Sequence, residues 1–553
     1  MGDRTDRTTD DQDTAEGGRQ GPPREGVVMK ALGWIERVGN KLPNPFWLFL
    51  LLAAITLVVS WLLARADVSV INPGDGEEVA VRNLLSGDGL LEMITEAIPN
   101  FMGFPPLGLV ITVLLGVAVA EHSGLLSAAL RGAVTKVRPS LLTFVIALGG
   151  IVGSVAADAM YVILPPLAAL AFKAVGRNPI VGVIVAFAGV AGGFNASLLV
   201  TPTDALLAGL STSAAGLIEE GYTVSPIANY FFSIASAILL ALVITITAET
   251  LLKKRMTVLE ATPVDEAQAE KNASADAAAQ AKANAASDDA EDDFEDLESM
   301  QLKPEERRGV WWSLIASLAF FALFMAVLVW PGSPLRGEDG GIVSSPVLLN
   351  IGIIIMLAFV IAGVTYGLIA GTITSVNDIP TFMTKGMLDM APVLVLFFAA
   401  SQFIAYFDWS NIGTVLAVNG ADLLDRSGLH PLAMLALVVV MTFLLNLLIT
   451  SGSAQWALMA PVIIPALMLV GIAPETTQMV FRIGDSASNI ISPVSPYFAL
   501  ILGYLQRYRR DAGVGTLISL TLPLSLVMVV AWFAFFMLWY ALGIPLGPGN
   551  PVR

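Results

Sequence analysis

The chain has 553 residues, of which 55% are hydrophobic and 14% charged, with a formal net charge of -16 and no cysteine. Its mean hydropathy of +0.73 is far from that of a soluble protein and indicates an integral membrane protein. The lack of cysteine excludes disulfides, thiolate metal sites and cysteine nucleophiles, and two histidines are too few for a zinc cluster. We expect no resident cofactor and no nucleic-acid partner.

Residues 1–30 are polar and rich in charge and glycine, and we expect them to form a disordered tail. The first transmembrane half follows at 31–255. Its first long apolar run starts late and is better explained by a transmembrane helix than by a cleaved leader. Runs long enough to span a bilayer recur along the chain: Phe46 to Ala64, Ala228 to Ala248, Trp311 to Trp330, Val347 to Ala370 and Leu517 to Leu542.

Two stretches, near 149–172 and near 449–471, contain glycine, serine and proline among apolar residues. This composition makes a continuous span unfavourable. We expect each stretch to form a re-entrant hairpin, a helix that enters the membrane, turns and leaves by the same face. The two share a Ser-x-x-Ala-polar pattern, which places Ser154 in the first hairpin and Ser451 with Ser453 in the second.

Each hairpin is followed by an interrupted helix, and the two interruptions resemble each other. The first reads GGFNASLLVTPTD and the second RIGDSASNIISPVSP. In each, an asparagine precedes a hydroxyl–proline pair by six residues: Asn195 before Thr201-Pro202, and Asn489 before Ser495-Pro496. Broken backbone at membrane depth is tolerated only where it lines a cavity or is buried in protein. Matching breaks in two halves indicate a secondary transporter whose site lies between the repeats.

An acidic, alanine-rich segment at 256–309 separates the first half from the second, at 310–553. We interpret it as a solvated linker, and its role stays open. Basic residues flank the linker and recur in short loops, whereas the charges in the loop at 67–96 are nearly all acidic, so the N-terminus and the linker are expected to be cytoplasmic. The sequence predicts an all-α membrane fold of the inverted-repeat type, with about nine transmembrane helices plus two hairpins.

Sodium or a proton is the expected coupling ion. Hard cations take oxygen ligands, and unwound carbonyls beside serine and asparagine supply them at transporter midplanes. One candidate sodium cage pairs Ser154 with Asn195, and the other pairs Ser451 or Ser453 with Asn489. Alternatively, each hydroxyl caps or bonds a helix. A proton-coupled pump needs a buried acid instead, and Asp158 and Asp204 qualify by position, so the choice between the ions stays open.

Three long patterns carry a resemblance to a known family: TPTDALLAGLS (Thr201 to Ser211), SGSAQWALMAPV (Ser451 to Val462) and RIGDSASNIISPVSPYF (Arg482 to Phe498). Over its membrane part the chain resembles the AbgT family, the p-aminobenzoyl-glutamate transporters. The resemblance implies a homodimer in the inner (cytoplasmic) membrane, each protomer having a transport core with two hairpins and an outer scaffold. It also implies ion-coupled transport of p-aminobenzoyl-glutamate, and in some members export of antimetabolites such as sulfonamides.

The resemblance implies a set of substrate-binding residues: Asp204, Asn446, Trp456, Arg482, Asp485 and the broken-helix residue Pro496. The second break adds Asn489 to this set. Arg482 offers a planar fork to a carboxylate, and Trp456 offers an aromatic face to a benzoyl ring. Arg482 and Asp485 lie one turn apart and are expected to pair when the site is empty. A purely structural ion pair, and a packing role for Trp456, are the alternatives.

Other functions fit less well. An intramembrane protease is disfavoured because there is no HExxH motif and because His122 and His430 lie outside the hairpins and breaks. A channel is disfavoured because hairpins facing broken helices suit an occluding carrier. The main alternative is a sodium-coupled carrier of dicarboxylates or other organic anions on a related two-hairpin fold. Import and export would use the same site, and the sequence does not distinguish them.

Overall fold

The computed structural model describes residues 45–71, 78–135, 137–156, 159–261, 263–266, 268–274, 301–337, 345–349, 351–550 and 552. The expected tail at 1–30, Asp158 and the middle of the linker lie outside these residues. The described part is helical apart from loops and one short antiparallel pair of strands, β1 (Ser69–Ile71) and β2 (Glu78–Ala80). The predicted all-α membrane class is confirmed.

The helices of the first half follow the apolar runs, and several begin with proline, which is favoured at the first helical position. They are α2 (Pro45–Arg65), α3 (Gly87–Thr95), α4 (Ala97–Met102), α5 (Pro105–His122), α6 (Leu125–Thr135), α7 (Leu142–Gly153), α8 (Ala159–Ala174), α9 (Pro179–Phe187), α10 (Pro202–Ala215), α11 (Tyr230–Thr247) and α12 (Lys253–Ala261). Short 3-10 or π turns extend three of them: η1 (Ser154–Ala156), η2 (Ala188–Gly192) and η3 (Ala248–Leu252).

The second half repeats the same pattern of elements. Its helices are α14 (Pro304–Val329), α15 (Pro346–Leu349), α16 (Gly352–Ala370), α17 (Asp378–Trp409), α18 (Ile412–Arg426), α19 (Pro431–Asn446), α20 (Gly452–Leu469), α21 (Pro474–Asn489), α22 (Pro496–Gln506) and α23 (Val514–Leu542). The order of two-helix hairpin, broken helix and long helix occurs twice: α7–α8, α9 with α10, then α11; and α19–α20, α21 with α22, then α23.

Eight helices of the described chain have the length and hydropathy to cross a bilayer: α2, α5, the continuous helix Tyr230–Ala261, α14, α16, the part Met390–Trp409 of α17, α20 and α23. Of these, α20 is an arm of the second hairpin. Each of the two broken helices consists of two short pieces, and we count it as one further crossing. The architecture therefore agrees with the expectation of about nine crossings plus two hairpins.

The hairpins begin earlier than the sequence indicated. The first runs from α7 through α8, and the second from α19 through α20. The stretches near 149–172 and 449–471 contain the turns and the second arms, but the whole of α19 precedes the latter stretch. After its first residue α19 has no glycine or proline, so its composition is that of an ordinary span.

Helix continues into both ends of the linker segment 256–309. The helix formed by α11, η3 and α12 runs without a break to Ala261, beyond the expected boundary at 255. The helix α14 begins at Pro304, before the expected boundary at 310, with Glu305 and Glu306 in its first turn. Acidic residues are stabilising near a helix N-terminus, which explains this early start.

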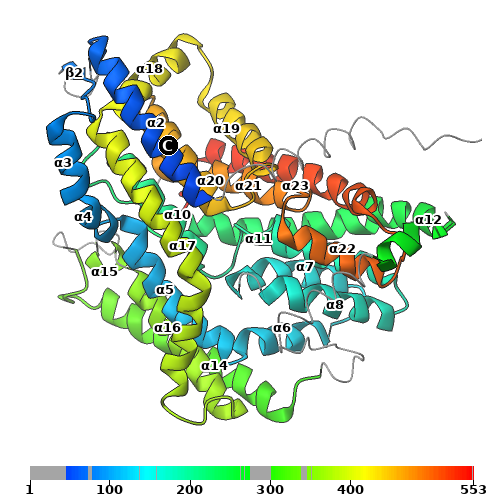
Figure 1. Ribbon diagram of the computed structural model, residues 1–553. Coiled ribbons are helices and arrows are strands. Elements are labelled where there is room, and N and C mark those ends of the chain that lie inside the picture. Colours follow the sequence, from blue (N-terminus) through cyan, green and yellow to red (C-terminus); the bar gives the residue numbers. More distant parts are fainter. Residues whose placement is uncertain are drawn as a thin grey trace, which may run out of the picture.

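The two largest hydrophobic clusters of the described chain divide it into a core and a scaffold. One cluster joins α7, α8, α9, α11, α19 and α21 to α23. The other joins α2, α5, α16 and α17, and includes α10 and α20. Figure 1 shows α2, α5, α14, α16 and α17 together on one side, with α7, α8, α11 and α22 on the other. The restart of the first broken helix and the second hairpin therefore lie where the two clusters meet.

Candidate functional site

Both helix breaks are built in the same way. The first separates η2, which ends at Gly192, from α10; the second separates α21, which ends at Asn489, from α22. The helix restarts with a proline in both, and the hydroxyl residue before it, Thr201 or Ser495, is the N-cap. Proline has the backbone angle of a helix and lacks an N–H that would be unsatisfied in the first turn. The repeated hydroxyl–proline pairs therefore mark where each helix restarts.

The two breaks contact each other directly. The backbone N–H of Asn195 donates to Ser486 Oγ (3.1 Å), and its Nδ2 donates to Asp485 Oδ2 (2.6 Å). In the other direction, Asn489 Nδ2 donates to the carbonyl of Ala191 (3.4 Å). Each asparagine of the repeated motif thus bonds the opposite repeat.

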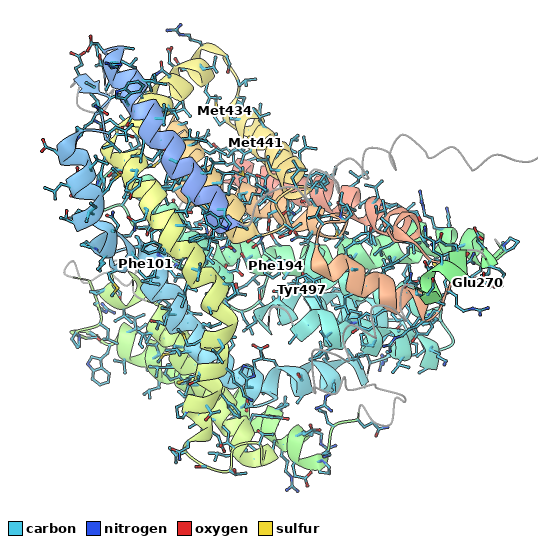
Figure 2. All side chains as sticks on the ribbon, viewed as in Figure 1. Phe101, Phe194, Glu270, Met434, Met441 and Tyr497 are labelled. Atoms are coloured by element: carbon cyan, nitrogen blue, oxygen red, sulfur yellow. The ribbon has the colours of Figure 1, made fainter. Side chains whose placement is uncertain are left out.

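A cavity of about 390 Å³ lies at this contact. This volume is within the range of about 300–1,000 Å³ that is common for small-molecule sites. Five residues of the sequence-predicted set line it: Asn195, Ser451, Ser453, Asp485 and Asn489. Ser495, of the second hydroxyl–proline pair, lines it as well, together with residues that the sequence did not single out for the site, among them Tyr161, Phe194, Thr203, Val393, Thr450, Phe481 and Tyr497. Phe194 and Tyr497 are labelled together near the middle of the molecule in Figure 2.

Asp485 is the one charged side chain among the described residues that line this cavity. Its Oδ1 atom is buried and has no hydrogen-bond partner in the described part of the chain, and the same holds for Asn195 Oδ1. The second hairpin approaches the carboxylate closely, since a Cβ on Gly452 would lie 3.1 Å from Asp485 Oδ1. A buried carboxylate oxygen and a buried amide oxygen, neither with a partner in the described part of the chain, suit a cation or a proton.

Three helices begin at the cavity wall. The first turns of α10, α20 and α22 contribute Thr203, Gly452 with Ser453, and Tyr497 to the lining. The N-terminus of a helix carries a partial positive charge and exposes backbone N–H groups, both of which favour anions. The cavity therefore combines one acid with three positive helix ends.

Arg482 and Asp204 form a buried ion pair between the two broken helices. Arg482 Nη1 donates to Asp204 Oδ1 at 2.5 Å, and the Arg482 side chain is 2% exposed. The other oxygen of Asp204 accepts from the backbone N–H and the hydroxyl of Thr201, which completes the cap of α10. The predicted pair of Arg482 with Asp485 is therefore wrong. An arginine on a helix extends toward the helix N-terminus, away from a residue three positions later.

Two further residues of the predicted substrate set are fully buried and lie outside the cavity lining. The Trp456 indole donates to Ser211 Oγ (3.0 Å), and its ring lies 4.4 Å from that of Phe481. Asn446 Nδ2 lies 2.8 Å from the carbonyl of Asp485 and 2.8 Å from Asn489 Oδ1. Asn446 thus stabilises the last turn of α21 by hydrogen bonds, and Trp456 packs between the two broken helices.

The candidate sodium cages are only partly brought together. Ser154 donates to the carbonyl of Ile151 (2.7 Å), a bond within its own helix turn, and does not line the cavity. Ser451 and Ser453 do line it, with their hydroxyl oxygens 3.1 Å apart. The side chain of Pro496 lies outside the described part of the chain.

Sequence reasoning missed the aromatic side of the site. The rings of Tyr161 and Tyr497 are stacked, with centroids 3.8 Å apart and planes inclined by 6°. Tyr161 follows the turn of the first hairpin, and Tyr497 follows the restart of the second broken helix. An aromatic residue directly after such an interruption was the available signal.

Comparison with known proteins agrees with this architecture. A family model described as the AbgT putative transporter family matches residues 30–287 and 279–553. The chain belongs to the AbgT family. The p-aminobenzoyl-glutamate transport protein of Escherichia coli (strain K12) is 35% identical over 528 residues, which cover 95% of this chain and 98% of that protein.

Solved structures of two AbgT-like transporters have the same fold. The YdaH transporter of Alcanivorax borkumensis is 38% identical with a TM-score of 0.81, and covers 92% of this chain and 100% of its own. MtrF of Neisseria gonorrhoeae, described as one of a class of antimetabolite efflux pumps, is 37% identical with a TM-score of 0.83, and covers 94% of this chain and 100% of its own. This AbgT protein is therefore a multi-pass membrane transporter and not an enzyme.

Proposed function

We propose that this protein is an ion-coupled secondary transporter of p-aminobenzoyl-glutamate and related aromatic carboxylates, including p-aminobenzoate-like antimetabolites such as sulfonamides. The observation that carries the proposal is the cavity shared by both helix breaks. It has an aromatic wall (Tyr161, Phe194, Tyr497) and a polar wall that includes the tip of the second hairpin. A solute with a ring at one end and carboxylates at the other matches both walls. The aromatic wall favours such a solute over an aliphatic dicarboxylate, the alternative substrate.

The charge of the cavity supports coupling to a cation. With Asp485 ionised, an anionic solute at about 4 Å would meet a repulsion of about 4 kcal/mol at an effective dielectric constant of about 20. That corresponds to roughly a thousandfold loss of affinity. A proton or a sodium ion on the unpartnered oxygen of Asp485 removes the repulsion. Ion and solute therefore bind together, which is the requirement for coupled transport.

Counterflow in proteoliposomes tests this function. Labelled p-aminobenzoyl-glutamate is measured with the sodium and proton gradients varied independently. We expect saturable exchange, and accumulation that depends on one of the two gradients. Asp485→Asn keeps the shape of the side chain but removes its charge, so this variant is expected to exchange solute without accumulating it against a gradient. Absence of exchange by the wild type, or gradient-driven accumulation by Asp485→Asn, contradicts the proposal.

The proposal includes the orientation in the inner membrane, with the N-terminus and the linker in the cytoplasm. The contacts of the basic loops support it. Arg509, in the loop after α22, donates to the carbonyl of Leu259 at the start of the linker (2.6 Å), and Arg131 pairs with Glu306 at its end (2.7 Å). Basic residues therefore contact the first and last described parts of the linker, which supports placing the linker on the same, cytoplasmic side as these residues under the positive-inside rule.

The proposal also includes the homodimer implied by the family resemblance. Chemical cross-linking in native membranes tests it, because a dimer gives a cross-linked species of twice the protomer mass that does not depend on expression level.

A further inference from the structure

The cavity between the breaks is lined by aromatic rings that lie outside the sequence-predicted site and take no part in the ion coupling. Four lining residues carry rings: Tyr161, Phe194, Phe481 and Tyr497. Phe481 is fully buried and packed against Trp456, which is also fully buried. Tyr497 and Phe194 are only partly buried. These two rings are therefore the ones that a solute in the cavity can reach.

Tyr497 is held in place by a residue of the other repeat. The Tyr161 ring stacks on it with centroids 3.8 Å apart, and Tyr161 itself packs edge-on against Phe187 at 6.4 Å. Tyr161 is 5% exposed and sits on α8, whereas Tyr497 is in the first turn of α22. The stack fixes the orientation of Tyr497 before a solute arrives. A ring that is already ordered binds another ring without losing side-chain freedom.

We propose that Tyr497, together with Phe194, binds the aromatic ring of the solute, and that Tyr161 is a positioning residue that orients Tyr497. The proposal depends on the proposed function for its ligand, p-aminobenzoyl-glutamate. The ring lies on the tyrosine side of the cavity, and the glutamyl group lies toward Ser451 and Ser453 at the start of α20. Ring binding is thereby assigned to Tyr497 in place of Trp456.

Equilibrium binding to the purified full-length protein in nanodiscs tests the assignment with two ligands. One is p-aminobenzoyl-glutamate, and the other is cyclohexanecarbonyl-glutamate, which carries the same glutamyl group on a saturated ring. We expect the wild type to prefer the aromatic ligand. Tyr497→Leu is expected to lose roughly two- to tenfold in affinity for the aromatic ligand, the usual range for an aromatic pair, and nothing for the saturated one.

Further variants separate contact from positioning. Tyr497→Phe retains the ring and is expected to keep the wild-type preference. Tyr161→Leu is expected to weaken the preference, but to add no further loss in a Tyr497→Leu background, because both changes act on the same contact. Tyr406→Leu is a matched control. Tyr406 packs against Trp409 on α17 and does not line the cavity, so both affinities should stay unchanged.

The opposite results overturn either the ring site or the proposed function. A Tyr497→Leu variant with the wild-type preference, or with equal losses for both ligands, overturns the ring site, as does a wild type that binds both ligands equally well. A Tyr497→Phe variant that loses the preference while keeping the wild-type melting temperature also overturns it. A wild type that binds neither ligand overturns the proposed function, and the ligand assigned here with it.

Discussion

At the scale of single residues, the ion pair of Asp204 and Arg482 joins two segments that are 278 positions apart in the chain. Each partner is largely buried, and Asp204 also caps α10 through Thr201. The pair therefore fixes the first broken helix against the second. A partner removed from such a pair leaves a buried charge without compensation, which is more costly than the loss of the bond itself.

We predict that Asp204→Ala destabilises the protein by about 3–5 kcal/mol, the usual cost of breaking a buried pair. Thermal unfolding in detergent measures the effect. The double variant Asp204→Asn with Arg482→Gln, which leaves no unpaired charge, should recover part of it. Arg426→Gln is the control: Arg426 pairs with Asp422 on the surface, where the side chains are 76% and 51% exposed, and should have little effect. Equal unfolding temperatures for Asp204→Ala and wild type would contradict this account.

Trp456 differs from the cavity residues in its surroundings. Because its indole is fully buried against Phe481 and bonds Ser211, we predict that Trp456→Phe retains most of the affinity for p-aminobenzoyl-glutamate. Isothermal titration calorimetry measures this affinity. If Trp456→Phe loses more affinity for p-aminobenzoyl-glutamate than Tyr497→Leu does, Trp456 and not Tyr497 binds the aromatic ring.

Sequence spacing could not predict which side chains pair with each other in this site. The sequence places Arg482 and Asp485 one turn apart, and a local pair was the simplest expectation. The actual partner, Asp204, lies in the other repeat, and only the crossing of the broken helices brings it close. In the same way, only the packing of α8 of the first hairpin against α22 of the second broken helix brings Tyr161 to Tyr497. Local spacing contains no information about either contact.

At the scale of elements, the turn of the second hairpin approaches the carboxylate of Asp485 more closely than most side chains would allow. A Cβ on Gly452 would lie 3.1 Å and 3.2 Å from the two carboxylate oxygens. We predict that Gly452→Ala lowers transport at least tenfold, because it displaces Asp485 from the turn, while the unfolding temperature changes little. The carboxylate must give way by a few tenths of an ångström, and in enzyme sites a misplacement of about 1 Å costs about a hundredfold.

The matched control is Gly503→Ala, since the new methyl group on α22 would meet nothing within 4 Å. Alanine is also the better helix former, so this variant should be at least as stable as the wild type. Initial rates of counterflow compare the two variants. Equal rates for Gly452→Ala and Gly503→Ala would show that the close approach has no role.

The helix breaks were predictable because their signals are local. Asn195 and Asn489, each followed by a hydroxyl–proline pair, mark the end of one helix and the N-cap of the next. The first arm of the second hairpin was not predictable in the same way. Its residues, from Pro431 to Asn446, are apolar except for Thr442 and Asn446, and composition does not distinguish a re-entrant arm from a full span. Only the polar turn at Ser451 shows that the chain reverses.

At the scale of the whole molecule, the start of the linker is attached to the second half of the chain. Asp511, in the loop before α23, accepts from Arg509 Nε (2.6 Å) and from the backbone N–H of Asp265 (3.1 Å). Asn272 donates to the carbonyls of Arg510 and Ala512 at 2.8 Å and 3.0 Å. The described segments 263–266 and 268–274 thus tie the end of α12 to the loop between α22 and α23.

We predict that acid loosens this attachment. The hydrogen bond from Arg509 holds the pKa of the Asp511 carboxyl below its ordinary value, and the N–H of Asp265 adds to the effect. A depressed pKa stabilises the folded contact above the unfolded pKa of about 3.9, and the stabilisation is lost as the pH falls through the folded value. Hydrogen exchange of the linker segment 263–274, corrected for the intrinsic rate, should therefore rise between about pH 5 and about pH 3.

Asp511→Asn should remove this pH dependence and leave the linker segment equally protected at both pH values. Asp422→Asn, in the exposed surface pair with Arg426, should leave the wild-type pH profile unchanged. An Asp511→Asn variant whose linker still loosens in acid would assign the effect to other carboxylates of the linker.

The three helix ends that face the cavity have a consequence for the range of solutes. The attraction for an acid comes there from peptide dipoles, since the guanidinium of Arg482 is occupied by Asp204. The positive ends of helix dipoles stabilise negative charge on a solute without requiring that it carry a full unit of charge. A weakly acidic sulfonamide and fully ionised p-aminobenzoyl-glutamate would then differ little in how well the cavity accepts them. Under the proposed function, this breadth is a property of the cavity's backbone and does not depend on any one side chain.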